Sequence, residues 1–146
     1  MSPATSARLA NDTWESVLTA HAVLMRRFAA AEIWERASMR EYDVLYTLSK
    51  CDEALRLTEL GQHVLLSQPA LSRLVDRLVE RGLVFRCEDP ADARAVRVSL
   101  TEEGREVQRE IGRAHARDVS AAMEPLTTEE LETLRTLTAK LLGRPQ

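Results

Sequence analysis

The stretch from residue 57 to residue 100 constrains the fold most, because a short helix, a tight turn, a longer helix and two strands follow one another there. The longer helix is predicted over residues 67–81, with Ser67 as its N-cap and Gly82 as its C-terminal stop. A short helix over residues 58–64 is predicted before it. This order predicts a helix-turn-helix, in which the second helix enters the major groove of DNA.

The outer face of the helix predicted at residues 67–81 carries side chains that suit base recognition. Leucine and valine residues cluster on the opposite side of a helical wheel. The first turn holds small or amide-bearing side chains, which allow close approach to a groove floor. Glutamine can pair with adenine and arginine with guanine. The alternative is an amphipathic surface helix that serves only as a scaffold, and the nearly balanced charge of this region does not decide between the two.

The charged loop between the two predicted strands favours the DNA-binding interpretation. Val96, Val98 and Leu100 alternate with polar residues, as in a half-buried strand. The loop before them presents Arg94, with Asp92 two residues earlier. An arginine on a protruding loop can enter the minor groove, and the aspartate can hold its guanidinium through a charge-assisted hydrogen bond. The alternative is an exposed ion pair that contributes less than about 1 kcal/mol.

Three amphipathic helices outside this central region need a surface to pack against. They are predicted over residues 13–34, 101–123 and 127–142, while residues 1–11 are expected to fray and Ser38 begins a further helix through a capping box. A small helix-turn-helix core offers limited room for three apolar stripes. A partner subunit is therefore expected to cover them.

The composition limits the function without naming it. A net charge of −3 counts mildly against nucleic acid as a partner, but a local basic face can bind phosphate on an acidic protein. Cys51 and Cys87 form no CxxC pair, which fits a reducing compartment. No apolar run is long enough for a membrane span and the N-terminus lacks a signal-peptide centre, so the cytoplasm is expected.

The residue patterns of common enzyme sites are not found in this sequence. No Ser/His/Asp or Cys/His set has a plausible spacing, and no glycine-rich phosphate loop occurs. His21, His63 and His115 are scattered without ligand-like spacing, so neither a metal site nor a cofactor is expected. His21 and His115 lie on predicted terminal helices, where a pH-sensitive contact is the alternative. The sequence therefore predicts a binding protein rather than an enzyme.

Residues 57–104 resemble the MarR family of winged helix-turn-helix regulators. The likeness rests on DARAVRVSLTEEG after ALSRLVDRLVERGLV, that is, on Asp-x-Arg, a strand and Leu-Thr-x-x-Gly. It implies a mainly α fold: a winged helix-turn-helix with a small β-hairpin wing, plus N- and C-terminal dimerisation helices in one intertwined domain. The implied regions are an N-terminal dimerisation helix at residues 1–37, a winged DNA-binding region at residues 38–100 and C-terminal dimerisation helices at residues 101–146.

The resemblance also implies a sequence-specific transcriptional regulator, with roles assigned by position. A homodimer would bind a pseudo-palindromic operator in double-stranded DNA, usually as a repressor that a small ligand or an oxidant releases. The residues expected to face the major groove are Ser67, Gln68, Ala70, Ser72 and Arg73. Contacts to the DNA backbone are expected from Ser38, Arg40, Arg77 and Arg86. Arg94 would enter the minor groove, oriented by Asp92.

An effector pocket in this family usually lies between the dimer helices and the winged region. The candidates by position are Trp14, His21, Met25, Phe28, Tyr42 and Tyr46. Aromatic and methionine side chains at helical spacing are also ordinary core residues, which is the alternative. The oxidant-sensing branch uses a cysteine early in the first helix, and this sequence has none there. Cys51 and Cys87 are therefore expected to be buried or inert thiols, and a redox role for Cys87 near the wing is the alternative. A winged-helix interaction module that has lost DNA binding is the competing function.

Overall fold

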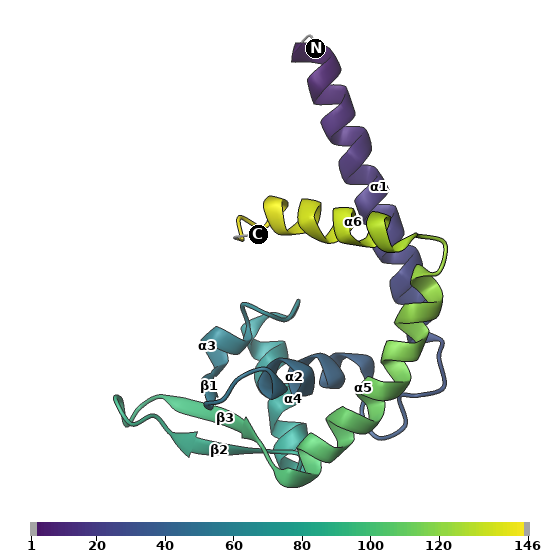
Figure 1. Cartoon of the computed structure of the whole chain (residues 1–146). Coiled ribbons are helices and arrows are strands. Elements are labelled where there is room, and N and C mark those ends of the chain that lie inside the picture. Colours follow the sequence, from purple (N-terminus) through teal and green to yellow (C-terminus); the bar gives the residue numbers. More distant parts are fainter. Residues whose placement is uncertain (1–2, 145–146) are drawn as a thin grey trace. The chain divides into compact units, whose positions relative to one another are not determined.

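A computed structural model describes residues 3–144 as helices with one small sheet (Figure 1). The described residues divide into two compact units. The winged unit comprises residues 32–115. The terminal-helix unit comprises the described residues before 32 and after 115, and α5 (Glu102–Met123) contributes residues to both units.

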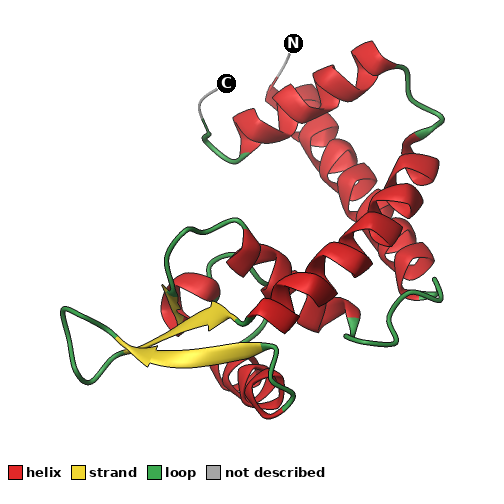
Figure 2. Ribbon diagram, turned by 60° about the horizontal axis from the view of Figure 1, so that its bottom comes forward, coloured by secondary structure: helices red, strands yellow, loops and turns green. Residues whose placement is uncertain are grey.

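The winged unit combines short helices with an antiparallel sheet. Its elements before α5 are α2 (Met39–Ser49), β1 (Leu55–Arg56), α3 (Leu57–Leu60), α4 (Gln68–Glu80), β2 (Val84–Glu88) and β3 (Val96–Leu100). The strand order is β1-β3-β2. β2 and β3 form a hairpin (Figure 2). In it Val84 lies opposite Leu100 and Glu88 opposite Val96. This arrangement confirms the predicted winged helix-turn-helix.

One apolar cluster joins all the elements of the winged unit. Its buried members include Tyr42, Val44, Leu45, Leu48, Leu60, Leu71, Leu74, Val75, Leu78, Val84, Val98, Leu100, Val107 and Ile111. In β3 burial follows the predicted alternation at Val98 and Leu100, which are buried, whereas Arg97 and Ser99 are half-buried. The prediction was wrong for Val96, which is exposed next to the wing loop. Because Val107 and Ile111 of α5 belong to this core, the winged unit extends beyond residue 100.

The ends of α4 follow the predicted signals. The hydroxyl of Ser67 accepts a hydrogen bond from the N–H of Ala70 at 3.3 Å, which satisfies a donor of the first turn. Gly82 adopts a φ of 74° directly after the helix, a conformation that costs a residue with a Cβ about 1–2 kcal/mol. The prediction of a helix over residues 58–64 was wrong in length, because α3 ends at Leu60. Tight turns follow it and bring Val64 into the core.

The Leu-Thr-x-x-Gly motif connects β3 to α5 and also holds the exit of α4. The Thr101 hydroxyl donates to the Gly82 carbonyl oxygen at 2.6 Å and accepts from the Gly104 N–H at 2.9 Å. The Thr101 N–H donates to the carbonyl oxygen of Leu83 at 3.1 Å. A Cβ on Gly104 would lie 1.9 Å from that same oxygen. Glycine is therefore required for α5 to approach this backbone so closely.

The terminal-helix unit consists of α1 (Pro3–Ala29), the end of α5 and α6 (Thr128–Leu141). α6 begins with a capping box, in which the Thr127 hydroxyl accepts from the Glu130 N–H at 3.2 Å and the Glu130 carboxylate accepts from the Thr127 N–H at 2.8 Å. Among the described side chains of this unit, Phe28 is buried, whereas Trp14 is 60% and Leu141 78% exposed. The apolar stripes of this unit thus lie open along most of their length.

The prediction for the first helix was wrong at both ends. Residues 3–11 are helical rather than frayed, and residues 1 and 2 lie outside the described part of the chain. The side chains of Asn11 and Thr13, near the predicted start, lie inside the helix and donate to carbonyl oxygens four residues earlier, at 2.9 and 2.7 Å. The helix also ends before residue 34, because Ile33 and Trp34 leave the helical path and pack against the core of the winged unit.

Candidate nucleic-acid interface

The outer face of α4 carries the side chains that were predicted to face DNA. Ser67, Gln68, Arg73 and Arg77 are exposed, and Ala70 and Ser72 are half-buried. The buried leucines on the opposite face hold this orientation, because rotating α4 would expose them to water. The structure therefore brings these residues to one surface, and their contact with DNA stays a prediction.

Arginines from α2 and α4 meet at one hollow beside this face. This arginine hollow has a volume of about 490 Å³ and is lined by Ser38, Arg40, Leu66, Ala70, Arg73, Leu74 and Arg77. None of these lining residues is acidic, so three positive charges face the same open space. Guanidinium groups arranged in this way suit the oxygens of phosphate groups. The sequence predicted a role for each arginine but not that they would meet.

The start of α2 is fixed at the edge of the arginine hollow. The Ser38 N–H donates to the Glu41 carboxylate at 2.9 Å, and the Ser38 hydroxyl accepts from the Glu41 N–H at 3.1 Å, which is the predicted capping box. Nη1 of Arg40 donates to the carbonyl oxygen of Leu65 at 3.1 Å. This last bond ties α2 to the turn before α4, so the two arginine-bearing helices are held together at the hollow.

Glu41 also connects α2 to the end of α4. Its carboxylate lies 2.8 Å from Nη1 of Arg81, and Arg81 donates a second hydrogen bond to the carbonyl oxygen of Arg36. Burial raises the pKa of Glu41, but the Ser38 N–H and the charge of Arg81 outweigh burial, so the pKa is lowered overall. The ionised pair orients α4 from its C-terminal end. The sequence analysis missed the role of Arg81, because the sequence around this residue indicates only that a helix ends there.

Arg86, expected to contact phosphate, is paired within the protein. Its guanidinium contacts the carboxylate of Asp76 on the outer face of α4. The two side chains are 38% and 55% exposed, so the pair adds little stability and a phosphate group can compete for the guanidinium. The predicted phosphate contact of Arg86 stays a prediction.

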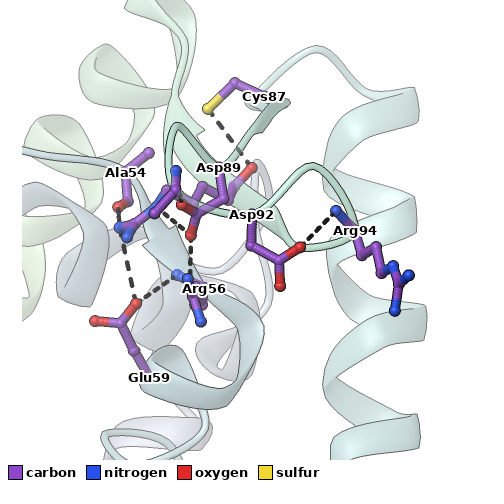
Figure 3. Close-up of polar contacts among 9 residues, drawn as sticks. Ala54, Arg56, Glu59, Cys87, Asp89, Asp92 and Arg94 are labelled. Atoms are coloured by element: carbon purple, nitrogen blue, oxygen red, sulfur yellow. Dashed lines mark hydrogen bonds and ion pairs between the residues drawn. The ribbon is translucent and has the colours of Figure 1, made fainter.

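The wing is the loop of residues 89–95, which projects from the β2–β3 hairpin (Figure 2). The prediction that the Arg94 guanidinium donates a hydrogen bond to the Asp92 carboxylate was wrong, because another group of Arg94 is the donor. Oδ1 of Asp92 instead accepts from the backbone N–H of Arg94 at 3.0 Å, and the guanidinium extends away from it (Figure 3). An aspartate reaches the N–H two residues later with little chain adjustment, which explains the difference. Asp92 therefore shapes the loop and leaves the Arg94 guanidinium exposed.

A buried carboxylate, Asp89, holds the base of the wing (Figure 3). Its side chain is 0% exposed, and Oδ2 accepts from Nε of Arg56 at 2.6 Å and from Nε of Arg97 at 2.9 Å. Oδ1 accepts from the N–H of Ala91 at 2.8 Å. The hydrogen bonds from Arg56, Ala91 and Arg97 outweigh burial and lower the pKa of Asp89 to about 2. The sequence analysis placed Asp89 only within the charged loop between the two strands, because an Asp-Pro pair is typical of a turn.

Gln68, the predicted reader of a base, lies against α3. Its Nε2 donates to the carbonyl oxygen of Leu57 at 3.4 Å, which is a long hydrogen bond. A Cβ on Gly61 would lie 2.3 Å from that Nε2, so the glycine makes room for the amide. An exposed bond of this length can be exchanged for one to a base edge at small cost. The role of Gln68 in base reading stays a prediction.

The candidates for an effector pocket fall into two groups. In the winged unit, the ring centroids of Tyr42 and Tyr46 lie 5.9 Å apart. Trp34 lies 5.8 Å from Tyr42 and 5.4 Å from His115, so four rings gather there. Sequence reasoning missed the place of Trp34 and His115 in this group because they are distant in the chain. The other candidates, Trp14, His21, Met25 and Phe28, lie along α1 in the terminal-helix unit. The pocket stays a prediction.

The cysteines and other side chains with metal-binding chemistry form no cluster in the part of the chain that the structure describes. Cys51 and Cys87 are unbridged and half-buried. Sγ of Cys87 lies 3.8 Å from the carbonyl oxygen of Arg97. Within residues 3–144, no group of three or more His, Cys, Asp or Glu side chains could hold a metal ion. The helices of the same residues include none with the length and apolarity needed to cross a membrane.

Known protein families and curated proteins resemble this chain mainly in the winged unit. The model of the MarR family matches residues 38–95, which include α2, α4 and the wing. The HTH-type transcriptional regulator SarZ of Staphylococcus aureus is 32% identical over 76 residues, which cover 48% of this chain and 51% of SarZ. The chain spans about half the length of the curated relatives it matches.

Solved structures extend the likeness to most of the chain. Sco3205, a MarR family transcriptional regulator from Streptomyces coelicolor in complex with DNA, is 28% identical with a TM-score of 0.76, over 90% of this chain and 84% of Sco3205. The PcaV transcriptional regulator from the same organism, in complex with its natural ligand, is 27% identical with a TM-score of 0.68, over 90% of this chain and 89% of PcaV. Together with the motifs described above, these matches show that residues 38–95 have the MarR family sequence pattern and that most of the chain shares the fold of a solved MarR family regulator.

Proposed function

We propose that this chain is a sequence-specific transcriptional regulator that binds double-stranded DNA. The observation that carries the proposal is the arginine hollow, where Arg40, Arg73 and Arg77 line one open space without an acidic neighbour in the lining. DNA presents a regular row of phosphates, and each phosphate that a protein neutralises releases condensed counterions. Three guanidinium groups beside an exposed helix face suit this partner better than a neutral one.

In the proposed complex, the first turn of α4 enters the major groove. Gln68 and Arg73 read base edges, while the small side chains of Ser67, Ala70 and Ser72 allow close approach. The proposed phosphate contacts are Ser38, Arg40, Arg77 and Arg86. Arg94 at the wing reaches the adjacent minor groove. The phosphate contacts set the register on DNA, and the base contacts supply the sequence preference.

A second copy of the chain is the proposed partner of the terminal-helix unit. Trp14, Leu137 and Leu141 are 60%, 53% and 78% exposed, and apolar patches of this kind mark interaction surfaces. A two-fold dimer would present two α4 helices to DNA. A pseudo-palindromic operator with half-sites about one helical turn apart follows from that symmetry.

Repression with release by a small molecule is the proposed mode of regulation, with the cytoplasm as the site of action. Among the relatives, Sco3205 was crystallised with DNA and PcaV with its natural ligand. An effector bound near Tyr42 and Tyr46 would favour a dimer whose α4 helices no longer match two successive major grooves. Such a ligand lowers operator affinity by its preference for that second state.

Selection of bound sequences from random DNA, followed by affinity measurements at rising salt, tests this proposal. A palindromic motif with half-sites about 10 base pairs apart is expected, with affinity falling steeply as salt increases. No enrichment together with salt-independent behaviour would reject DNA binding and favour a winged-helix interaction module. Enrichment of a single half-site without symmetry would reject the dimeric arrangement.

A further inference from the structure

The charged cluster at the base of the wing takes no part in the contacts proposed above. Asp89 follows β2 directly, Arg97 lies in β3, Arg56 in β1 and Glu59 in α3. Oδ2 of Asp89 accepts from Nε of Arg56 at 2.6 Å and from Nε of Arg97 at 2.9 Å. Oε1 of Glu59 accepts from the N–H of Arg56 at 3.1 Å and lies 3.8 Å from Nη1 of Arg97. The cluster therefore joins the wing to β1 and α3, the elements that precede α4.

The same carboxylate also sets the path of the wing loop. Oδ1 of Asp89 accepts from the Ala91 N–H at 2.8 Å, and the Asp89 N–H donates to the Ala95 carbonyl oxygen at 3.1 Å. The Asp92 N–H donates to the Asp89 carbonyl oxygen at 3.3 Å, and Oδ1 of Asp92 accepts from the Arg94 N–H at 3.0 Å (Figure 3). A series of hydrogen bonds thus leads from the buried end of the loop to Arg94.

We propose that Asp89 is a positioning residue for DNA recognition, which clamps Arg56 and Arg97 and so fixes the wing at the orientation in which Arg94 reaches the minor groove. The inference rests on the proposed function, because it assigns Asp89 to the Arg94 contact. A wing without this clamp would sample several orientations, and ordering it on DNA would lower affinity. The clamp orders the wing before DNA arrives.

The sign of the expected effect separates positioning from simple electrostatics. Removing a negative charge near DNA strengthens binding when only the electrostatic field matters. Asp89→Asn would also leave Arg56 and Arg97 less neutralised, which acts in the same direction. Positioning predicts the opposite result, namely weaker binding, although the protein has become more positive.

Operator binding of Asp89→Asn is compared with that of wild type, Glu88→Gln and Arg94→Ala. Glu88 is the adjacent, exposed carboxylate, so Glu88→Gln removes the same charge outside the cluster. We expect Asp89→Asn to lower affinity about tenfold and Arg94→Ala by about tenfold to a hundredfold. Glu88→Gln should bind as tightly as wild type or slightly more tightly. Asp89→Asn that binds as tightly as Glu88→Gln would overturn the inference.

The deciding measurement is a double-mutant cycle between Asp89→Asn and Arg94→Ala. If Asp89 acts through Arg94, Asp89→Asn has less than about a twofold effect in the Arg94→Ala background. Protection of the minor groove from hydroxyl radicals should also be lost in both single variants. Equal effects of Asp89→Asn in the two backgrounds would overturn the inference. A wild-type chain that binds no DNA would instead contradict the proposed function, so the two failures are distinct.

A second variant keeps the test decisive if Asp89→Asn unfolds at the assay temperature. Arg56→Gln is suited to this, because the Arg56 side chain is 38% exposed and Asp89 keeps its bond to Arg97. This variant removes a positive charge, so its single effect is not diagnostic. Coupling between Arg56→Gln and Arg94→Ala supports the inference, and additive effects overturn it.

Discussion

The winged unit and the terminal-helix unit contain leucines at similar helical spacing but bury them differently. Leu45, Leu71 and Leu78 of the winged unit are 0% exposed, whereas Leu137 and Leu141 of α6 are 53% and 78% exposed. Helical periodicity indicates that an apolar stripe of a helix has to be buried, but it does not say which surface buries it. In the winged unit, the other elements of the same unit bury the stripe. In the terminal-helix unit, we propose that a second copy of the chain buries it.

The two units also differ in how far their polar contacts reach along the chain. In the winged unit, Glu41 pairs with Arg81 across 40 residues of sequence. In the terminal-helix unit, the hydroxyls of Thr13 and Thr138 donate to carbonyl oxygens four residues back in their own helices. Contacts between distant segments fix one arrangement of elements, whereas bonds within a helix fix only that helix. The terminal helices are therefore suited to completing their packing against another chain.

Gly104→Ala should break the winged unit and is the largest effect that we expect. The added Cβ would lie 1.9 Å from the carbonyl oxygen of Leu83, and this backbone cannot shift without disturbing the bonds of Thr101. We expect a loss of about 3 kcal/mol or more in the free energy of unfolding, measured by urea denaturation.

The matched control for this substitution is Glu106→Ala, an exposed position of the same helix. It should change the free energy of unfolding by less than about 0.5 kcal/mol. If Gly104→Ala unfolds at the wild-type urea midpoint, the close packing of α5 on Leu83 is incorrect.

A charge on the α6 stripe should act on the dimer and spare the winged unit. Leu134 is 45% exposed in the single chain, and the proposed partner would cover it. Leu134→Glu should raise the dimer dissociation constant by at least about a hundredfold, because it places a carboxylate in an apolar interface. Analytical ultracentrifugation over a range of concentrations measures this. The adjacent exposed residue provides the control: Arg135→Gln should remain dimeric. A Leu134→Glu variant with the wild-type dissociation constant would show that this stripe is not the interface.

Arg77→Gln sharpens the comparison by testing the charge of the arginine hollow. Loss of one phosphate contact should weaken binding by about tenfold for all DNA sequences alike, and it should lower the slope of log affinity against log salt by about 1. Titrations of specific and unrelated DNA at several salt concentrations measure both quantities. Arg135→Gln in the terminal-helix unit removes the same charge and should alter neither. Equal effects of the two variants would mean that net charge alone, rather than the hollow, governs binding.

The local features of the fold could be predicted because each depends on residues close together in the chain. The caps at Ser38 and Ser67, the stop at Gly82 and the burial of Val98 and Leu100 in β3 are of this kind. The start of α1 could not be predicted, because the hydroxyl of a threonine such as Thr13 can either cap a helix or donate a hydrogen bond to the backbone inside one. The residue type is the same in both cases, and the packing around it decides.

The candidate site was predictable residue by residue but not as an arrangement. Arg40, Arg73 and Arg77 were each expected to contact DNA, yet their common hollow depends on how α2 packs beside α4. The role of Asp89 was missed because its partners Arg56 and Arg97 lie 33 and 8 residues away in sequence. Ion pairs between distant segments have no sequence period, so a single chain gives no signal for them.

The smallest effect that we expect concerns the pH dependence of stability. The difference in the free energy of unfolding between Asp89→Asn and wild type should stay constant near neutral pH. The hydrogen bonds from Arg56, Ala91 and Arg97 lower the pKa of Asp89 to about 2. A carboxylate whose pKa is lowered in the folded state stabilises that state above the unfolded pKa of about 4, and the contribution is lost as the pH falls from about 4 to 2.

Asp89→Asn should therefore differ from wild type by the same free energy of unfolding at pH 8 and pH 5, and the difference should shrink below about pH 4. Urea denaturation at pH 8, 5 and 3 measures this. A difference that already changes between pH 8 and pH 5 would mean that the carboxylate takes up its proton there, and that the arginine clamp at the wing base does not form in the folded chain.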